Sequence, residues 1–181
     1  MAREARGDAT ALLRTSDASR IAAHLEDAAH VPGGHATALA VPRNEADVSR
    51  AVLEADTVLT IGAQSSLTGG ATPRGEVLVS TERLRRLDVQ EDGTVRVGAG
   101  VTIAELDGRL RQQGWLYPPA PTWHGATVGG TVATNAAGAA TFKYGSTRAW
   151  VEALTVVLAS GAVLDVVRSE EHSPRWPGPH A

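Results

Sequence analysis

The chain has 181 residues, a formal net charge of −3 and 43% hydrophobic residues, values typical of one ordinary globular domain or two small lobes. This acidic balance argues against a nucleic-acid binder, which would need a basic face. Because the sequence contains no cysteine, disulfides, thiolate metal sites and a cysteine nucleophile are excluded.

The sequence predicts neither a targeting signal nor a membrane span. Its first eight residues, Met-Ala-Arg-Glu-Ala-Arg-Gly-Asp, are too charged to lead into a signal-peptide core. The longest apolar stretch, residues 151–167, is interrupted by Glu152 and Asp165. We therefore expect a cytoplasmic protein.

The N-terminal part of the chain predicts one helix after a lead-in without a clear period. Residues 16–29 carry an apolar face at helical spacing, and Thr15 or Ser16 can cap the helix. We expect residues 1–37 to form this helix and its lead-in.

The next part of the chain predicts a small parallel sheet. Three short apolar runs have the composition of buried strands: residues 38–41, 58–61 and 77–80. Between the first two runs, Asn44 caps a helix with a regular apolar face. We expect a first lobe over residues 38–86, with three parallel strands in a βαβ-like arrangement.

The rest of the chain contains turn motifs that are typical of antiparallel strands. An Asp-Gly turn at residues 92–93 and a Ser-Gly turn at residues 160–161 each predict a hairpin. Thr102 and Glu105 have the spacing of a capping box at the start of a helix. We expect a second, mostly antiparallel lobe over residues 87–167, and thus an α+β (α/β) fold of two lobes with a cleft between them.

A glycine-rich loop, the first loop, covers residues 61–71 and directly follows a predicted buried strand, a position where α/β sheets bind ligands. Its successive N–H groups can form a nest around phosphate oxygens, with hydroxyl groups from Ser65, Ser66 and Thr68. A Walker A motif is excluded because the chain's only lysine is Lys143, and a Rossmann motif because no helix can follow. A plain surface turn is the alternative.

A second stretch of small residues, the second segment, covers residues 118–138 and begins with three prolines. A large flat ligand can lie against such a backbone and form hydrogen bonds with its N–H and C=O groups. The polar side chains available there are Thr122, Thr127, Thr134 and Asn135. A packing seam of small residues between the lobes is the alternative.

Taken together, these motifs resemble the FAD-linked oxidases whose flavin domain is of the p-cresol methylhydroxylase type. This group includes vanillyl-alcohol oxidase, D-lactate dehydrogenases and the glycolate oxidase flavin subunit. The likeness spans about residues 38–167. It rests on Val41-Pro42, residues 62–70 with Leu67-Thr68-Gly69-Gly70, residues 95–101, Pro118-Pro119, residues 127–138 and residues 144–148.

The resemblance implies FAD between the two lobes. It implies that the first loop holds the diphosphate through Gly62, Ala63, Gln64, Ser65, Ser66, Leu67, Thr68 and Gly69. It implies that the ribityl chain and isoalloxazine ring lie along Pro121, Thr122, Thr127, Val128, Gly129, Gly130, Thr134, Asn135, Ala136 and Ala137. Some members of the family attach FAD to a histidine, and because the first loop contains none, we expect non-covalent FAD.

The function implied is that of the FAD-binding domain of an oxidoreductase that oxidises a hydroxy acid or alcohol by hydride transfer to flavin. The family's substrate-cap domain and its Gly-Ser-Glu-Gly-Thr-Leu-Gly type motif do not follow residue 167, and Ala149 stands where an acidic residue is common. We therefore expect a cap from another chain or segment and assign no catalytic residue. Two alternatives stay open: a subunit of a split oxidase, and a non-catalytic truncated fragment whose residues 168–181 form a disordered tail.

Other candidate residues indicate no further chemistry. The six histidines lack metal-binding spacing, and we expect His24 and His30 to be exposed near a helix and His124 to point to solvent. Ser66 lacks the G-x-S-x-G elbow of a hydrolase. The basic cluster at residues 83–86 is interpreted as a solvated surface.

Overall fold

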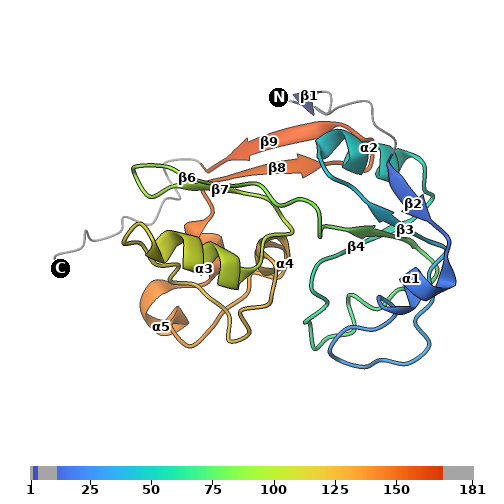
Figure 1. Cartoon of the computed structure of the whole chain (residues 1–181), viewed down its shortest axis with the longest axis horizontal. Helices are drawn as coiled ribbons and strands as arrows, with labels where there is room; N and C mark the ends of the chain where they lie inside the picture. The colour runs from blue at the N-terminus through green and yellow to red at the C-terminus, as the bar shows by residue number, and fades with distance from the viewer. Residues whose placement is uncertain (1, 4–11, 169–181) are drawn as a thin grey trace.

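Two lobes of α+β structure lie side by side in the computed structural model, which describes residues 2–3 and 12–168 (Figure 1). The predicted fold class is confirmed. In chain order the elements are β1 (Ala2–Arg3), β2 (Leu13–Thr15), α1 (Ala18–Ala22), β3 (Ala38–Val41), α2 (Glu45–Leu53), β4 (Val58–Ile61), β5 (Val77–Ser80), β6 (Leu87–Val89), β7 (Val95–Val97), α3 (Ile103–Arg111), α4 (Val128–Ala133), α5 (Thr141–Tyr144), the 3₁₀ helix η1 (Thr147–Trp150), β8 (Ala153–Val157) and β9 (Val163–Val167).

The first lobe is built on a four-stranded sheet with the order β2-β3-β5-β4. The strands β3, β5 and β4 are parallel and have the predicted bounds, and every residue of β3 and β5 is buried. The edge strand β2 pairs antiparallel with β3, whereas the sequence predicts only a lead-in there. Asn44 caps α2 as predicted, since its side chain accepts a hydrogen bond from the N–H of Asp47.

The N-terminal helix is much shorter than its sequence pattern predicts. Residues 16–29 were expected to be helical, but α1 ends at Ala22, and its cap is Asp17, not Thr15 or Ser16. The chain turns after α1 because Asp27 is buried and bonded to the far end of the first loop, through the N–H of Ala71. A tertiary contact has overridden local helical periodicity.

The second lobe has its own core, under the β6–β7 hairpin and α3. The hairpin turns at the predicted Asp-Gly pair, and the capping box of Thr102 and Glu105 starts α3 as predicted. Apolar side chains from α3, from the strand-like segment before it and from the start of α4 fill the core, namely Val101, Ile103, Leu106, Leu110, Ala126 and Val128.

The hairpin of β8 and β9 extends across the top of both lobes (Figure 1). Its turn at Gly161 rests on α2 of the first lobe, where the Ser49 hydroxyl donates to the Gly161 carbonyl at 2.7 Å. A Cβ atom on Gly161 would lie 2.7 Å from a methyl group of Leu53, so only glycine allows this close approach. The hairpin therefore helps to set the position of one lobe relative to the other.

The linker between the lobes is held by main-chain hydrogen bonds. The N–H of Gly98 donates to the carbonyl of Arg86 at 2.8 Å, and the N–H of Gly100 donates to the carbonyl of Leu84 at 3.0 Å. Because backbone lies directly against backbone here, the linker packs as part of the second lobe.

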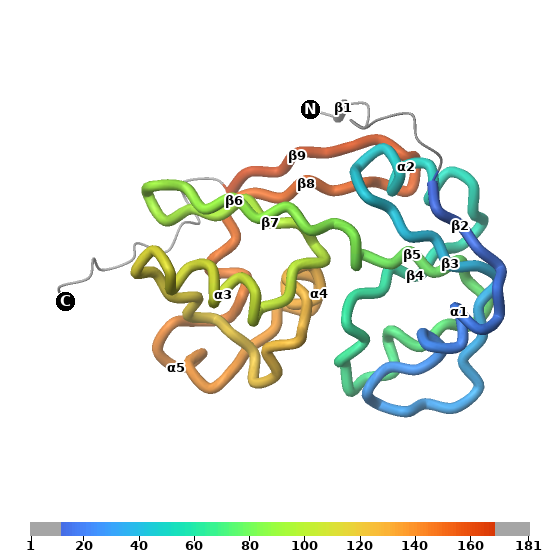
Figure 2. Tube along the Cα trace, in the orientation of Figure 1, coloured from blue at the N-terminus to red at the C-terminus, as the bar shows by residue number. Residues whose placement is uncertain are grey.

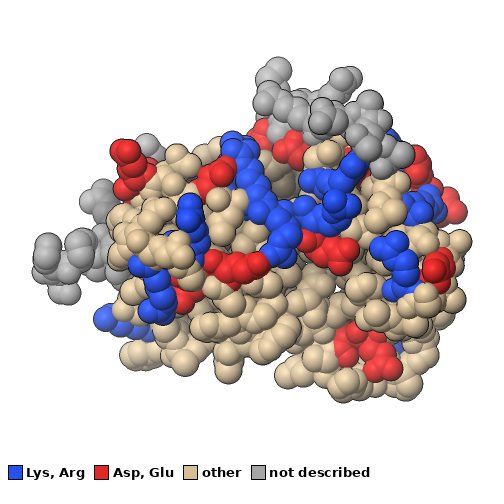
Figure 3. All heavy atoms as spheres, in the orientation of Figure 1, with Lys and Arg blue, Asp and Glu red and all other residues tan. Residues whose placement is uncertain are grey.

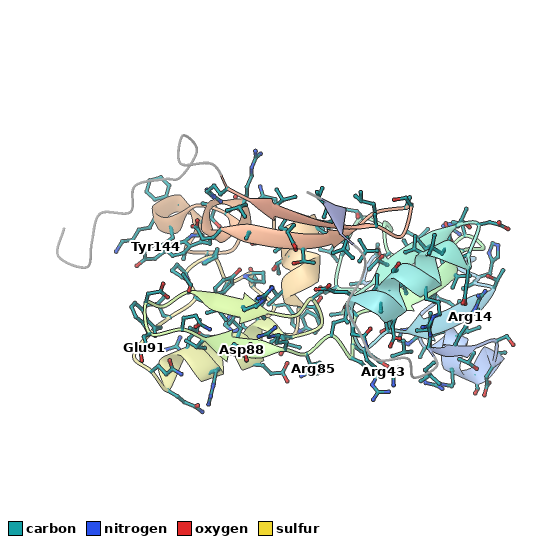
Figure 4. All side chains as sticks on the ribbon, turned by 90° about the horizontal axis from the view of Figure 1, so that it is seen from above. Arg14, Arg43, Arg85, Asp88, Glu91 and Tyr144 are labelled. Atoms are coloured by element: carbon teal, nitrogen blue, oxygen red, sulfur yellow. The ribbon has the colours of Figure 1, made fainter. Side chains whose placement is uncertain are left out.

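Arginine side chains gather across the middle of one face, over the boundary between the lobes (Figure 3). Seen from above, Arg43 and Arg85 lie next to each other at this boundary (Figure 4). Arg43 pairs with the buried carboxylate of Asp47 at 2.9 Å, whereas Arg85 pairs with Glu105. These arginines are thus engaged in ion pairs at the surface. Among residues 2–3 and 12–168, no helix combines the length and apolar character needed to cross a membrane.

Candidate functional site

The first loop leaves β4 and runs along the side of its lobe that faces α4 (Figure 2). The carbonyl of Ile61 accepts hydrogen bonds from the N–H and the hydroxyl of Thr81, at 3.0 and 3.2 Å, which fixes where the loop begins. Within the described ranges, the N–H groups of residues 63–67 donate to no other protein group. A run of free N–H groups is what a loop needs to bind phosphate oxygens.

The first loop and the second segment meet at Gly62 and Thr127. A Cβ atom on Gly62 would lie 2.3 Å from the Oγ1 atom of Thr127. The two lobes can therefore touch here because glycine has no side chain. Thr127 is buried, and its hydroxyl caps α4 by accepting from the N–H of Gly130. The structure therefore brings together the two stretches that the sequence singles out 65 positions apart.

The second segment differs from expectation because most of its N–H groups already have partners. It contains the short helix α4, which the sequence does not predict. The N–H of Val128 donates to Val101 at 2.8 Å and that of Gly129 to Ala99 at 2.9 Å. A Cβ atom on Gly129 would lie 2.6 Å from that of Ala99, so Gly129 packs closely against the segment before α3. Residues 128–136 of this segment thus form a rigid surface without free donors, whereas the N–H groups of residues 122–125 donate to no other group of the described residues.

A cavity of about 540 Å³ opens beside the first loop, within the usual size range of ligand pockets. Residues of the first loop, the turn after α1 and the second segment line it, namely Ala23, His24, Glu26, Asp27, Ala28, His30, Gly62, Ala63, Gln64, Ser65 and Trp123.

The two carboxylates that line the cavity are both engaged by protein partners. Asp27 is 3% exposed and accepts from the N–H groups of Ala29 and Ala71, at 3.0 and 3.2 Å. Glu26 pairs with the imidazole of His30 at 3.1 Å. Both acids therefore accept hydrogen bonds from protein groups beside the first loop.

Two histidines have a place that the sequence analysis missed. His24 and His30 were expected to be exposed residues near a helix; His30 is exposed as expected, and both line the cavity. His24 is half-buried, and its Nδ1 atom lies 3.2 Å from Oε1 of Gln64 in the first loop. His124 is exposed, as expected.

The predicted site residues divide into two groups in the structure. Gly62, Ala63, Gln64 and Ser65 line the cavity, and the rest of the first loop continues away from it, with the Leu67 side chain 79% exposed. The predicted residues of the second segment do not line this cavity; Trp123, which was not predicted, does. The sequence offers one weak indication that Trp123 belongs to the site: it is a large aromatic residue inside a stretch of small residues.

Behind the second segment, the half-buried Tyr117 lies next to the side chains of Thr147 and Thr131. Burial raises the pKa of Tyr117, and hydrogen bonds with Thr147 and Thr131 act in the opposite direction. The Thr147 hydroxyl also donates to the carbonyl of Ala136 at 2.8 Å. Tyr117 therefore stays protonated at neutral pH, as a structural group under residues 131–136.

Residues 2–3 and 12–168 contain no group of three or more histidine, aspartate or glutamate side chains placed to hold a metal ion.

Comparisons with known proteins show which family and which relatives this chain is similar to. A family model described as "FAD binding domain" matches residues 36–166. Over 107 residues the chain is 43% identical to the D-lactate dehydrogenase of Archaeoglobus fulgidus, and over 137 residues it is 36% identical to the D-2-hydroxyglutarate dehydrogenase of Xanthomonas citri pv. viticola. These matches cover 58% and 71% of this chain but only 24% and 29% of the two relatives.

A solved structure shares the fold. The chain superposes on glucooligosaccharide oxidase from Acremonium strictum with a TM-score of 0.76 and 22% identity, over 86% of this chain and 34% of that one. The flavin of that oxidase is 6-S-cysteinyl, 8α-N1-histidyl FAD. At this identity, the likeness concerns the fold alone.

Proposed function

Because the chain belongs to the FAD binding domain family, we propose that it forms the FAD-holding part of a flavin-dependent dehydrogenase that acts on 2-hydroxy acids. The expected resemblance and the cofactor FAD are confirmed by this family match and by the dehydrogenase relatives. The chain spans only about a quarter of those relatives, so activity and substrate are part of the proposal.

One observation carries the proposal: free N–H groups of residues 63–67 lie beside a cavity, at the point where Gly62 touches Thr127. Backbone N–H groups that need no reorganisation suit a diphosphate. The residues present therefore fit FAD, and we assign the diphosphate to residues 62–69. We assign the ribityl chain and ring to the small-residue surface of residues 121–130 and 134–137.

FAD, when bound, supplies the acceptor for a hydride from the carbon that carries the substrate hydroxyl. The chain's own residues bind and orient it: the first loop by its N–H groups, the second segment as a wall, and Trp123 as an aromatic edge of the cavity. We take residues 38–167 as the FAD-binding unit, with lobes over residues 38–86 and 87–167. The groups that position substrate and remove its proton are proposed to lie in protein that corresponds to the unmatched part of the relatives.

Several finer points stay predictions. They are a separate cap subunit, a split oxidase as its assembly, and a cytoplasmic location. We further propose that FAD is held without a covalent bond. The sequence contains no cysteine for a cysteinyl link, and the first loop contains no histidine.

The test is a visible spectrum of the purified chain before and after denaturation. We expect FAD to bind in a one-to-one ratio and to be released free by denaturation. A folded protein that stays colourless after incubation with FAD would contradict the proposal. Flavin that stays attached to the denatured chain would contradict only the non-covalent part, and His24 or His30 would then be the residues to examine.

A matched ligand separates the role of the first loop from general affinity for flavin. Riboflavin carries the ring and the ribityl chain but neither the diphosphate nor the adenosine of FAD, so the affinity for free adenosine is measured beside it. If residues 63–67 bind the diphosphate, FAD binds far more tightly than riboflavin. Equal affinities would show that the free N–H groups do not contribute.

A further inference from the structure

Three residues other than glycine adopt left-handed backbone conformations in the described ranges: His30, Gln64 and Asn135, with φ of 52°, 48° and 48°. All three lie in or beside the two stretches assigned to FAD. Side chains rarely tolerate this region, and residues held in it gather at functional sites, where surrounding contacts enforce the conformation. Gln64 and Asn135 share a further property, because both carry a side-chain amide that is bonded to the backbone of another segment.

The amide of Gln64 ties the first loop at two points. Its Nε2 atom donates to the carbonyl of His24 at 3.0 Å and to the carbonyl of Ala71 at 2.8 Å. Because carbonyls only accept, this fixes the orientation of the amide, so its Oε1 atom accepts from Nδ1 of His24 at 3.2 Å. The main-chain carbonyl of Gln64 in turn accepts from Ala28 at 2.9 Å. Gln64, one of the residues with a free N–H group, is thus held by both its side chain and its carbonyl.

Asn135 has the same role in the second segment. Its Oδ1 atom accepts from the N–H of Arg148 at 2.9 Å, and its own N–H donates to the carbonyl of Val132 at 3.2 Å. The carbonyl of the next residue, Ala136, accepts from both the N–H and the hydroxyl of Thr147. Residues 135–136 are therefore clamped by residues 147–148.

We propose that Gln64 and Asn135 are a pair of positioning residues: their side-chain amides hold the two FAD-contacting stretches in left-handed conformations that shape the site before FAD arrives. This inference rests on the proposed function. Its physical consequence is a smaller ordering cost on binding, since the loops are already in place.

Replacing each residue with glycine distinguishes the effect of its side chain from the effect of its backbone conformation. Glycine adopts a φ of 48° freely, so Q64G and N135G keep the conformation accessible and remove only the amide. A matched control is N44G, because Asn44 also bonds to local backbone, at the start of α2, outside the site. We expect the dissociation constant for FAD to rise at least about tenfold in Q64G and in N135G. In N44G it stays within about twofold of the parent.

A second measurement needs no FAD. Amide hydrogen exchange of the FAD-free chain should be several-fold faster at Ala28, whose N–H donates to the carbonyl of Gln64, in Q64G and at residues 135–138 in N135G, with the rest of the chain unchanged. The variant N135D keeps an oxygen that accepts from Arg148. It should therefore restore slow exchange at residues 135–138.

The outcomes are distinguishable. If the parent chain takes up no FAD, the proposed function fails and this inference fails with it. If the parent binds FAD and the two glycine variants bind it within twofold of the parent, this inference alone is wrong. Faster exchange across the whole chain of Q64G and N135G, with a matching drop in melting temperature, would also overturn it, because it would indicate a general role in folding.

Discussion

The first loop and the second segment are both rich in small residues, yet their backbones are used in opposite ways. In the first loop, the N–H groups of residues 63–67 have no protein partner within the described ranges. In the second segment, the N–H groups of Val128, Gly129 and Ala136 are all bonded to other carbonyls of the same lobe. Small size therefore serves close packing at residues 128–136, whereas residues 63–67 keep N–H groups that are free to bind a ligand.

This difference has a consequence for how a dinucleotide would be bound. The first loop offers donors, which suit the charged diphosphate. The second segment offers a preformed surface that is held by α4, by Ala99 and by the clamp of residues 147–148. We expect changes in the first loop to alter affinity, and changes in the second segment to alter stability first and affinity through it.

The largest effect is expected where the two regions touch. In Gly62→Val, the new side chain would overlap Oγ1 of Thr127, which lies 2.3 Å from the position of a Cβ atom. Overpacking of this kind costs about 1–3 kcal/mol. We expect this loss in the free energy of unfolding, and weaker FAD binding as well, because the first loop must move away from Thr127. The measurement is an FAD titration of the folded variant.

A matched control for this variant is Gly108→Val. Gly108 lies in α3 with no atom within 4 Å of a Cβ position, so FAD affinity should equal that of the parent. Parent-like FAD binding by Gly62→Val would contradict the close contact between the lobes.

The second-largest effect tests the packing role of the second segment. In Gly129→Ala, the added methyl group would lie 2.6 Å from Cβ of Ala99. We expect urea denaturation to show a loss of about 1–3 kcal/mol in the free energy of unfolding. The neighbouring variant Gly130→Ala meets only the Thr127 hydroxyl, at 3.1 Å, and should lose much less. Equal stability of both variants would show that Gly129 does not fix α4.

A smaller effect is expected from the aromatic edge of the cavity. Trp123 is 55% exposed and is the residue of the second segment that lines the cavity. If its ring stacks on part of FAD, Trp123→Leu should weaken binding about two- to tenfold, as expected for an aromatic contact. Trp115→Leu, at the turn against Gly93, serves as the control. Unchanged affinity in Trp123→Leu would remove this side chain from the site.

The smallest effect lies outside both regions. Hydrogen bonds from the N–H and the hydroxyl of Thr102 hold the pKa of Glu105 below its ordinary value of 4.5. A lowered pKa in the folded state stabilises the protein above pH 4.5, and this contribution is lost as the pH falls through the folded-state pKa. Thermal melts should therefore show a higher melting temperature for the parent than for Glu105→Gln at pH 7, with a gap that narrows as the pH falls below 4.5. A gap that is constant with pH would contradict the capping box.

Much of the fold could be predicted from local patterns. The strands at residues 38–41, 58–61 and 77–80 are short dense apolar runs, and a buried parallel strand needs little more. The capping box at Thr102 is a self-contained interaction between neighbours in the sequence. The short helix α4 could not be predicted, because it contains two glycines and depends on Thr127 and on packing against Ala99.

The site was predictable only in part, for a similar reason. The first loop could be identified because it follows a buried strand and is rich in glycine. The place of His24 could not be identified, because the turn after α1 reaches the loop through Asp27 and Gln64, which are far apart in the sequence. Tertiary contacts of this kind have no periodicity or motif that a single sequence can reveal.

The most direct test of the central claim compares the backbone N–H signals of the two regions. In amide NMR spectra of the nitrogen-15-labelled chain, titration with FAD, and separately with ADP as a diphosphate probe, should shift the signals of residues 63–67. ADP should leave the signals of residues 128–136 nearly unchanged, because those N–H groups already have partners. Signals of residues 63–67 that stay fixed while FAD saturates the chain would contradict the account.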